Sequence, residues 1–446
     1  MVLSRLFSPI ADTDRRVIVL ALARMVGALG NSFLVVVLPL YIASEVVDVD
    51  ALLGSTVGVA GIGMTVTEPL LIGFVLSLFG FLNSLSQPFT GRLSDRTGSR
   101  KPFILAGVLL LGTASGLYAF ATEYWMLVLL RAIQGLGAAL TIPATVALVN
   151  EYATSGSERG GNFGVYNTFR LIGFGLGPII AGAAVEAGPY DLGWLGIDLV
   201  ISGFDAAFIV AFVGAYLSLG LVYLFVHDAA EASEAGEDLS IRIRGDESLL
   251  DPVFALGLAT IAMGICIALY ATLQNQINVR LDQAPIWFGA QFSAVTLANV
   301  FLQIPVGRAC DRFGRRPFLL SGFVLLIPAT LFQGIVTTPV TMLAVRILQG
   351  VSVAFVFAPS LALAGDIARE GESGSTLSVL TMGFGFGIAL GPLVSGWLVA
   401  YGFLVPFAVG AGLAAVALLA VITQVYETHD VRDKDLAVDA DADAAE

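Results

Sequence analysis

Apolar residues run along this chain in long uninterrupted segments and do not alternate with polar residues. A helix needs about 20 such residues to cross the ~30 Å hydrocarbon core of a bilayer. The pattern therefore predicts an all-α membrane protein. Continuous runs are unlike the alternating strands of a membrane β-barrel. Twelve segments qualify as spanning helices: residues 17–42, 67–90, 102–121, 124–149, 161–186, 205–226, 253–277, 286–306, 317–336, 339–365, 375–401 and 404–426. The further apolar stretch 52–64 either lengthens the second span or lies in the membrane interface.

Composition excludes a soluble protein. The 446 residues are 57% hydrophobic and 13% charged, whereas soluble domains carry about 25% charged residues. A soluble globule of this kind would expose large apolar patches, so soluble enzymes and nucleic-acid binders are excluded. The net charge is −13, and Lys101 and Lys434 are the only lysines. We expect a halophilic source from this acidic, lysine-poor composition. Two cysteines and two histidines predict neither a disulfide framework nor a metal site.

The positive charges indicate the orientation of the spans. With the N-terminus inside, Arg280 is the only cation in an outer loop, and the remaining loop and terminal cations are cytoplasmic. We therefore expect a plasma-membrane protein with both termini in the cytoplasm. The acidic segment 227–252 is predicted to be a solvated linker between two six-helix halves, 1–226 and 253–426. The tail 427–446 is predicted to be disordered.

The two halves are repeats of one unit. Four features recur at an offset of 214 to 216 residues. They are the series Gly91, Asp95, Arg96, Gly98 and Gly307, Asp311, Arg312, Gly314; the pairs Arg131, Gln134 and Arg346, Gln349; the acids Glu151 and Asp366; and the dipeptides Gly177-Pro178 and Gly391-Pro392. Transporters are commonly built from such repeats, with a binding site near the midplane between them.

The repeated pattern G-x-x-x-D-R-x-G-x-R, followed by Arg or Lys, resembles the signature of the major facilitator superfamily, over about 410 of the 446 residues. The resemblance implies twelve helices in two six-helix pseudo-repeats and transport by alternating access. The segment Leu38-Pro39-Leu40-Tyr41 resembles a feature of the drug:proton antiporter branch of this superfamily. So does the motif formed by Gly173, Gly177, Pro178 and Gly182. The resemblance implies that this Gly-Pro motif has a role in antiport and seals the cavity against leak. The alternative is that its small residues only allow close helix packing.

Paired charge clusters are the predicted gates. Asp95 and Asp311 are carboxylates among cations at helix ends, where they can pair with arginine. We expect each cluster to form only when the cytoplasmic ends of the halves are close, and so to favour the outward-facing state. The glycines would allow close backbone approach. The alternative is a tight polar turn. The gating candidates are Gly91, Asp95, Arg96, Gly98, Arg100, Glu151, Gly307, Asp311, Arg312, Gly314, Arg315 and Asp366.

Polar residues within spans are candidates for coupling and substrate binding. The resemblance implies a proton-coupling role for Arg131, with Gln134 on the same face; a structural role is the alternative. Arg24 and Glu68 are further coupling candidates, although Glu68 also fits a helix start. The cavity candidates are Asn31, Asn167, Arg170, Gln274, Asn275, Asn278, Asn299, Gln303, Arg346 and Gln349. Any one amide can instead form an interhelical hydrogen bond. The cluster at 274–278 is richer than packing requires, and the seventh span can break there.

These observations predict a secondary transporter. The chain has no G-x-x-x-x-G-K-S/T phosphate loop and no catalytic constellation, so we expect no enzyme activity and no cofactor. The partners expected are a small-molecule substrate, a coupling ion and the bilayer, for a monomer that binds no nucleic acid. The branch resemblance favours proton-coupled efflux of small amphiphilic compounds. The charges in mid-membrane are all arginines, which favours the alternative, uptake or exchange of an anionic or neutral metabolite.

Overall fold

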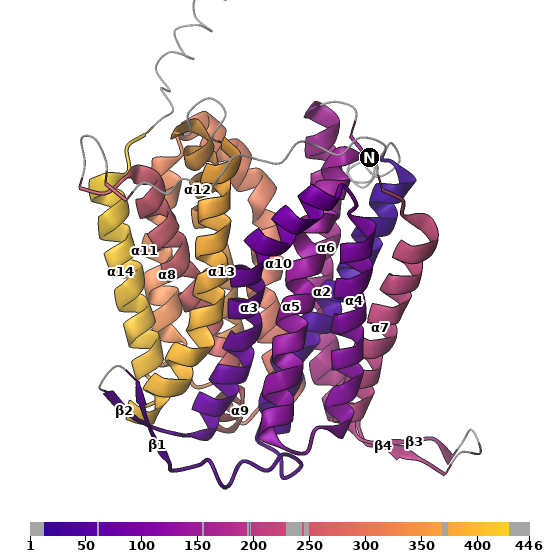
Figure 1. Cartoon of the computed structure of the whole chain (residues 1–446). Helices are drawn as coiled ribbons and strands as arrows, with labels where there is room; N and C mark the ends of the chain where they lie inside the picture. The colour runs from indigo at the N-terminus through magenta and orange to yellow at the C-terminus, as the bar shows by residue number, and fades with distance from the viewer. Residues whose placement is uncertain are drawn as a thin grey trace, which may run out of the picture.

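The computed structural model describes residues 13–59, 62–153, 156–193, 196, 198–228, 243–244, 249–367 and 373–427. It is a bundle of long, roughly parallel helices with short connections (Figure 1). The described chain begins and ends at the same end of this bundle. Most of the predicted linker and tail lies outside the described residues.

The first half contains six long helices. They are α2 (Arg15–Ile42), α3 (Glu68–Thr97), α4 (Lys101–Leu117) with the short helix η1 (Tyr118–Phe120), α5 (Tyr124–Glu151), α6 (Gly156–Ala187) and α7 (Gly203–Phe225). The second half repeats this series. Its helices are α8 (Pro252–Thr272), α9 (Gln274–Leu281), α10 (Pro285–Phe313), α11 (Arg316–Phe332), α12 (Pro339–Ile367), α13 (Ser373–Leu398) with η3 (Val399–Tyr401), and α14 (Val405–Gln424).

Every predicted span corresponds to a helix. Eleven helices among the described residues are long and apolar enough to cross a membrane. The twelfth, α11, has 17 residues and occupies the ninth predicted span, which is at the lower limit for crossing. The predicted fold class, an all-α membrane protein of two six-helix units, is confirmed.

Two predicted loops are largely helical. Helix α3 continues to Thr97 and α10 to Phe313, so Gly91, Asp95 and their repeats lie on the last turns of helices. Each helix ends at a glycine with positive φ, 66° at Gly98 and 92° at Gly314. A side chain at these positions would be strained, because only glycine adopts this region freely. The true connections are therefore shorter than the sequence pattern predicts.

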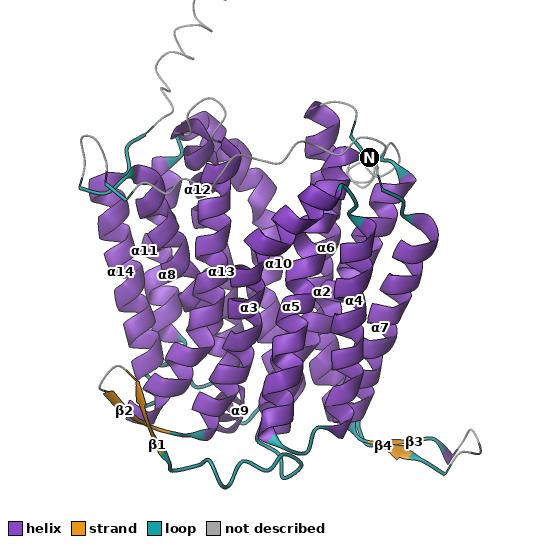
Figure 2. Cartoon of the chain, viewed as in Figure 1, coloured by secondary structure: helices purple, strands orange, loops and turns teal. Residues whose placement is uncertain are grey.

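The apolar stretch 52–64 forms a hairpin and does not extend the second span. Strand β1 (Thr56–Val59) pairs antiparallel with β2 (Ile62–Thr65), and Thr56 lies opposite Thr65. A second short pair, β3 (Tyr190–Asp191) with β4 (Val200–Ile201), lies at the same end of the bundle (Figure 2). We call this the hairpin end. The opposite end, which carries Gly98–Arg100 and Gly314–Arg315, is called the arginine-rich end.

The seventh predicted span is interrupted, as the amide cluster indicated. Leu273 has φ −94° and ψ 16°, and it separates α8 from the short helix α9. Asp282 then ends α9 in a left-handed conformation with φ 48°. The break places the amides of 274–278 on a separate element.

The two halves touch mainly through two helix pairs, α3 with α13 and α6 with α10. The repeat relates these pairs, because α10 corresponds to α3 and α13 to α6. One buried cluster draws residues from both halves, among them Phe33, Tyr270 and Phe288. Two other clusters lie each within one half. Apolar burial thus forms a core inside each half and a shared core between them.

Candidate functional site

Glycine–proline contacts join the halves near the hairpin end. A Cβ atom at Gly289 of α10 would overlap the carbonyl oxygen of Pro178 on α6. The repeat produces the same contact between Gly73 of α3 and Pro392 of α13. Without a side chain on the glycines, the helix backbones approach to direct contact. Both interfaces are thus built from equivalent residues.

The next turns of these helices repeat the arrangement. A Cβ atom at Gly182 would lie 2.7 Å from the carbonyl oxygen of Pro285, and one at Gly396 would overlap that of Pro69. Pro69 and Pro285 are in the first turns of α3 and α10, at the hairpin end. The two halves are therefore in backbone contact at that end, on both sides of the interface.

The predicted Gly-Pro motif has two separate packing roles. Gly173 lies against the carbonyl oxygen of Met25, and Gly177 lies against Ser32, so both pack α6 on α2 within the first half. Pro178 and Gly182 contact α10 of the second half. The motif therefore supports both the fold of one half and the contact between halves.

The described glycines at the arginine-rich end make no such contacts. A Cβ atom at Gly91 would have one neighbour within 4 Å, Pro143 of its own half, and one at Gly307 would have none. Gly161 and Gly164 at the start of α6 also face open space. The close approach expected at Gly91 and Gly307 is thus absent from this conformation, because the halves meet nearer the hairpin end.

Arg100 is the centre of the first charge cluster. It lies just before α4 and is 2% exposed. Its guanidinium lies 2.5 Å from a carboxylate oxygen of Asp95 and 2.9 Å from one of Glu151. Burial lowers the pKa of Arg100, but the hydrogen bonds with Glu151 and Asp95 more than offset this, so its pKa is raised overall.

Arg315 is the equivalent centre in the second half. It pairs with Asp366 at the end of α12 and lies 3.6 Å from Asp311. It also donates to the carbonyl oxygen of Ala362 at 2.6 Å. Arg96 and Arg312 are in the last turns of α3 and α10, and Arg312 lies over the ring of Phe313.

The location of these clusters corrects one expectation. The ion pairs Arg100–Asp95, Arg100–Glu151 and Arg315–Asp366 each lie within one half, and they are formed although, among the described residues, Gly91 and Gly307 have no neighbour from the opposite half. Their formation therefore does not require the arginine-rich ends to meet. The physical reason is that Arg100 and Arg315 reach the acids of their own half directly.

Sequence reasoning missed two acids that complete these clusters. Asp228 accepts hydrogen bonds from the backbone N–H groups of Arg100 and Lys101, each at 2.7 Å. Glu427 accepts from the backbone N–H groups of Arg315 and Arg316 at 3.2 and 2.8 Å. Each acid thus caps a helix N-terminus, α4 or α11.

A signal for these two acids was present in the sequence. Each lies three residues after the last helix of its half, since α7 ends at Phe225 and α14 at Gln424. They were assigned to the linker and the tail. Burial raises the pKa of the Asp228 carboxyl, but hydrogen bonds from Ser99, Lys101 and Arg100 lower it by more, so its pKa is lowered overall.

Arg131 and Gln134 lie inside the first half. Both are buried; the guanidinium donates to Gln134 at 3.1 Å and lies over the ring of Phe79. Gln134 also accepts from the hydroxyl of Tyr118 and donates to Ser115. The Nε atom of Arg131 has no hydrogen-bond partner among the described residues. This geometry fits both a structural and a coupling role.

Arg346 and Gln349 are enclosed in the second half. Arg346 is 0% exposed and bonds the carbonyl oxygen of Gln291 and the side chains of Gln333 and Gln349. Its guanidinium also lies 4.1 Å from the ring centroid of Tyr270. The structure therefore places both residues in packing between helices of one half, away from any surface that a substrate could reach in this conformation.

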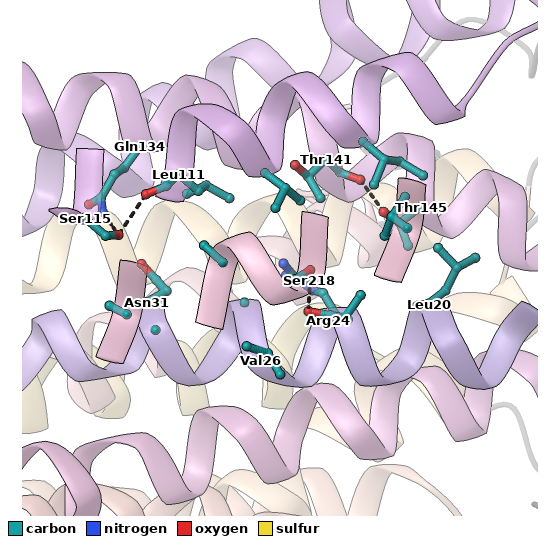
Figure 3. A pocket seen from close by; sticks show the side chains of 18 residues that line it. Leu20, Arg24, Val26, Asn31, Leu111, Ser115, Gln134, Thr141, Thr145 and Ser218 are labelled. Carbon is teal, nitrogen blue, oxygen red and sulfur yellow. Dashed lines mark hydrogen bonds between the residues drawn. The ribbon is translucent and has the colours of Figure 1, made fainter. Parts of the chain in front are cut away.

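Arg24 and Asn31 line a narrow cavity of about 40 Å³ between α2, α4, α5 and α7 (Figure 3). Gln134 lies in its wall as well. Arg170 is outside the lining and its guanidinium donates to Asn167 at 2.8 Å. The cavity is within the first half, so these candidates do not share one space between the halves.

The amides of α9 have different surroundings. Gln274 is 0% exposed, and neither its nitrogen nor its oxygen has a partner among the described residues. Asn275 reaches across the halves to Glu68 at 3.4 Å, and Asn278 accepts from Gln283. Asn299 also has a buried oxygen without a described partner, whereas Gln303, one turn further along α10, is partly exposed.

Glu68 is the first residue of α3. The hydroxyl of Thr67 accepts from the N–H of Leu70 and caps the helix. An acid in the first turn is stabilised by the positive end of the helix dipole. The geometry thus fits the helix-start interpretation, and the contact with Asn275 places Glu68 at the interface between the halves.

Curated relatives include transporters named for drug export. The chain is 26% identical over 336 residues to the multi-drug resistance efflux pump PmrA homolog of Lactococcus lactis, covering 74% of this chain and 78% of that protein. It is 23% identical over 382 residues to the quinolone resistance protein NorA of Staphylococcus aureus, covering 82% and 90%. Both alignments extend over most of the two repeats.

Solved structures share the fold. The human organic anion transporter MFSD10 (TETRAN) aligns with a TM-score of 0.63 at 19% identity, covering 91% of this chain and 99% of that one. A bacterial homolog of the human lysosomal transporter Spinster, inward-facing and occupied, aligns with a TM-score of 0.69 at 15% identity, covering 92% and 94%. The family model described as Major Facilitator Superfamily matches residues 20–275 and 252–440, almost the whole chain. Repeat, fold and family model agree, and the chain belongs to the Major Facilitator Superfamily.

Proposed function

We propose that this protein is a proton-coupled secondary transporter that exports small amphiphilic compounds across the plasma membrane by alternating access. In this proposal the arginine-rich end and both termini are cytoplasmic, as the distribution of arginines favours. Relatives named as a multi-drug resistance efflux pump and a quinolone resistance protein support export.

The observation that carries the proposal is the asymmetry of the interface between the halves. Backbone contacts such as Gly289 with Pro178 close the hairpin end, whereas Gly91 and Gly307 have no neighbour from the opposite half in the part of the chain that the structure describes. A transporter that alternates between two states needs a contact at one end that can be exchanged for a contact at the other. A cavity open to the cytoplasm would load substrate for export.

A second candidate, transport of anionic compounds, is favoured by the embedded charges. Arg24, Arg131 and Arg170 lie in the helices of the first half, where the acids lie only toward helix ends. Positive potential attracts anions. The likeness to a structure titled as an organic anion transporter supports this candidate in a general way.

Purified protein in proteoliposomes tests both candidates. We expect a cationic amphiphilic dye to move when a proton gradient is imposed, and the flux to collapse with a protonophore. Protein-free liposomes give the background. Flux of the cationic dye that ignores the proton gradient would refute proton coupling. Flux of an anionic dye alone would support the second candidate, and no flux of either dye would contradict both.

A further inference from the structure

Arg24 is a partly exposed charged residue within α2, and no acid of the described residues pairs with it. It makes no hydrogen bond or ion pair with the described part of the chain, and its Nε atom is buried without a partner. An arginine at membrane depth is costly unless it is paired or faces a polar space. Arg346 shows the usual solution, since its guanidinium bonds two glutamines and a carbonyl oxygen.

A second arginine adds to the positive charge near Arg24. Helices α2 and α6 are in backbone contact where Gly173 lies against the carbonyl oxygen of Met25. Arg24 is adjacent to Met25, and Arg170 lies one turn before Gly173, so both are at the same level of the bundle. Arg170 therefore adds to the positive potential at the level of Arg24. Acids on the described helices of this half lie only toward helix ends, so no carboxylate offsets the two charges there.

The space beside Arg24 has the size of a small ion. The cavity it lines measures about 40 Å³, and a single water needs roughly 10–15 Å³ on this measure. It can therefore hold a monatomic anion with one or two waters, and it is too small for an organic substrate. The hydroxyls of Ser218 and Thr145 in its wall donate to backbone carbonyls. Arg24 is thus the cationic donor available to an occupant.

We propose that this cavity is a binding site for a small inorganic anion of the halide class, held by Arg24 and favoured by the positive potential of Arg170. The anion would supply the counter-charge that the described helices lack at this level and would stabilise the packing of α2 against its neighbours. This site is separate from the transport path between the halves, so its occupancy can be measured whether or not a transported substrate is known.

The test uses the purified full-length protein in detergent. Sodium chloride is titrated against sodium gluconate at constant ionic strength, because gluconate is too large for the cavity. We expect the melting temperature to rise with chloride and to saturate, since a ligand that binds only the folded state stabilises it. Bromide should act in the same way. An equal melting temperature in chloride and gluconate would show that water alone fills the cavity, and would overturn the proposal.

Variants locate the effect. Arg24→Gln should abolish the chloride-dependent rise, whereas Arg16→Gln, on the same helix outside the membrane, should keep it. Arg170→Gln should retain saturation but need about ten times more chloride, equivalent to ~1.4 kcal/mol of lost binding energy. An unchanged chloride response in Arg24→Gln would contradict the site. If Arg24→Gln does not fold, the test rests on Arg170→Gln. A chloride concentration at half-maximal stabilisation equal to that of the wild type would then overturn the proposal.

Discussion

Gly289 of α10 lies against the carbonyl oxygen of Pro178 on α6, with no space for even one methyl group between the two halves. The repeat creates the same relationship between Gly73 and Pro392. Two such contacts on opposite sides of the interface close the hairpin end. They belong to helices that must separate if that end opens.

Gly289→Val should prevent closure of the hairpin end. The added methyl groups would overlap the backbone of α6, so we expect loss of transport, and higher labelling of a cysteine introduced at that end. Gly412→Val is the matched control, because Gly412 is exposed on α14 and a Cβ atom there has no neighbour within 4 Å. Equal transport by the two variants would contradict the role of this contact.

Glu151→Gln should destabilise the first half more than Asp95→Asn. Both acids pair with Arg100, but the side chain of Glu151 is 5% exposed and that of Asp95 is 28% exposed. Removing the more buried partner of a buried charge lowers the free energy of unfolding by more. We expect a loss of about 1–3 kcal/mol, because Arg100 keeps its other acidic partner. Melting temperatures of the purified variants measure the difference. A larger fall in melting temperature for Asp95→Asn than for Glu151→Gln would show that the exposure of the acid does not decide which variant is less stable.

Asp228→Asn should change the response of stability to acid. The pKa of Asp228 is lowered from its ordinary value of 3.8 in the folded protein. Its stabilising effect is therefore present above the unfolded-state pKa and is lost as pH falls through the lower folded-state pKa. We expect the fall in melting temperature below about pH 4 to be smaller in Asp228→Asn than in the wild type.

Glu45→Gln, which alters an exposed acid at the hairpin end, is the control for this acid response. It should retain the wild-type pH profile. A profile of Asp228→Asn identical to that of the wild type would exclude a role for the α4 cap in acid stability.

Arg346→Lys should destabilise the protein although the charge is kept. Lysine cannot bond Gln291, Gln333 and Gln349 from one planar group, so buried amides would lose partners. We expect a loss of about 2–4 kcal/mol and a lower melting temperature. Arg280→Lys, at an exposed position near the hairpin end, should have a small effect. A wild-type melting temperature for Arg346→Lys would show that this network contributes little.

Much of the architecture could be predicted because membrane helices follow a length rule. Apolar runs of about 20 residues located every span, and the recurrence of Asp95 as Asp311 revealed the repeat. The break near Gln274 was also predicted, since four amides cannot all face lipid. For the segment 52–64 the sequence left two alternatives, a longer second span or an interfacial position, because a short apolar run is compatible with a strand as well as a helix. The paired strands exclude the longer span.

The candidate site was predicted less completely. Sequence spacing placed Arg131 with Gln134 and Arg346 with Gln349, because residues three apart share a helix face. It could not show that Arg346 is enclosed in one half while Arg24 borders a cavity, since both are single arginines in apolar runs. Asp228 and Glu427 were missed because they contact helix ends more than 100 residues away.

The length of the apolar segments and the internal repetition by themselves determined the helices, the two halves and the family signature, because these depend on local composition and length. Tertiary structure alone decided where the halves touch and which charges are paired. Gly289 is one of 50 glycines in the sequence, and only the packing of α10 on α6 makes it a point of closure. The partners of a buried charge are likewise the groups that lie close to it in the folded protein, and the order of residues along the chain does not reveal which groups these are.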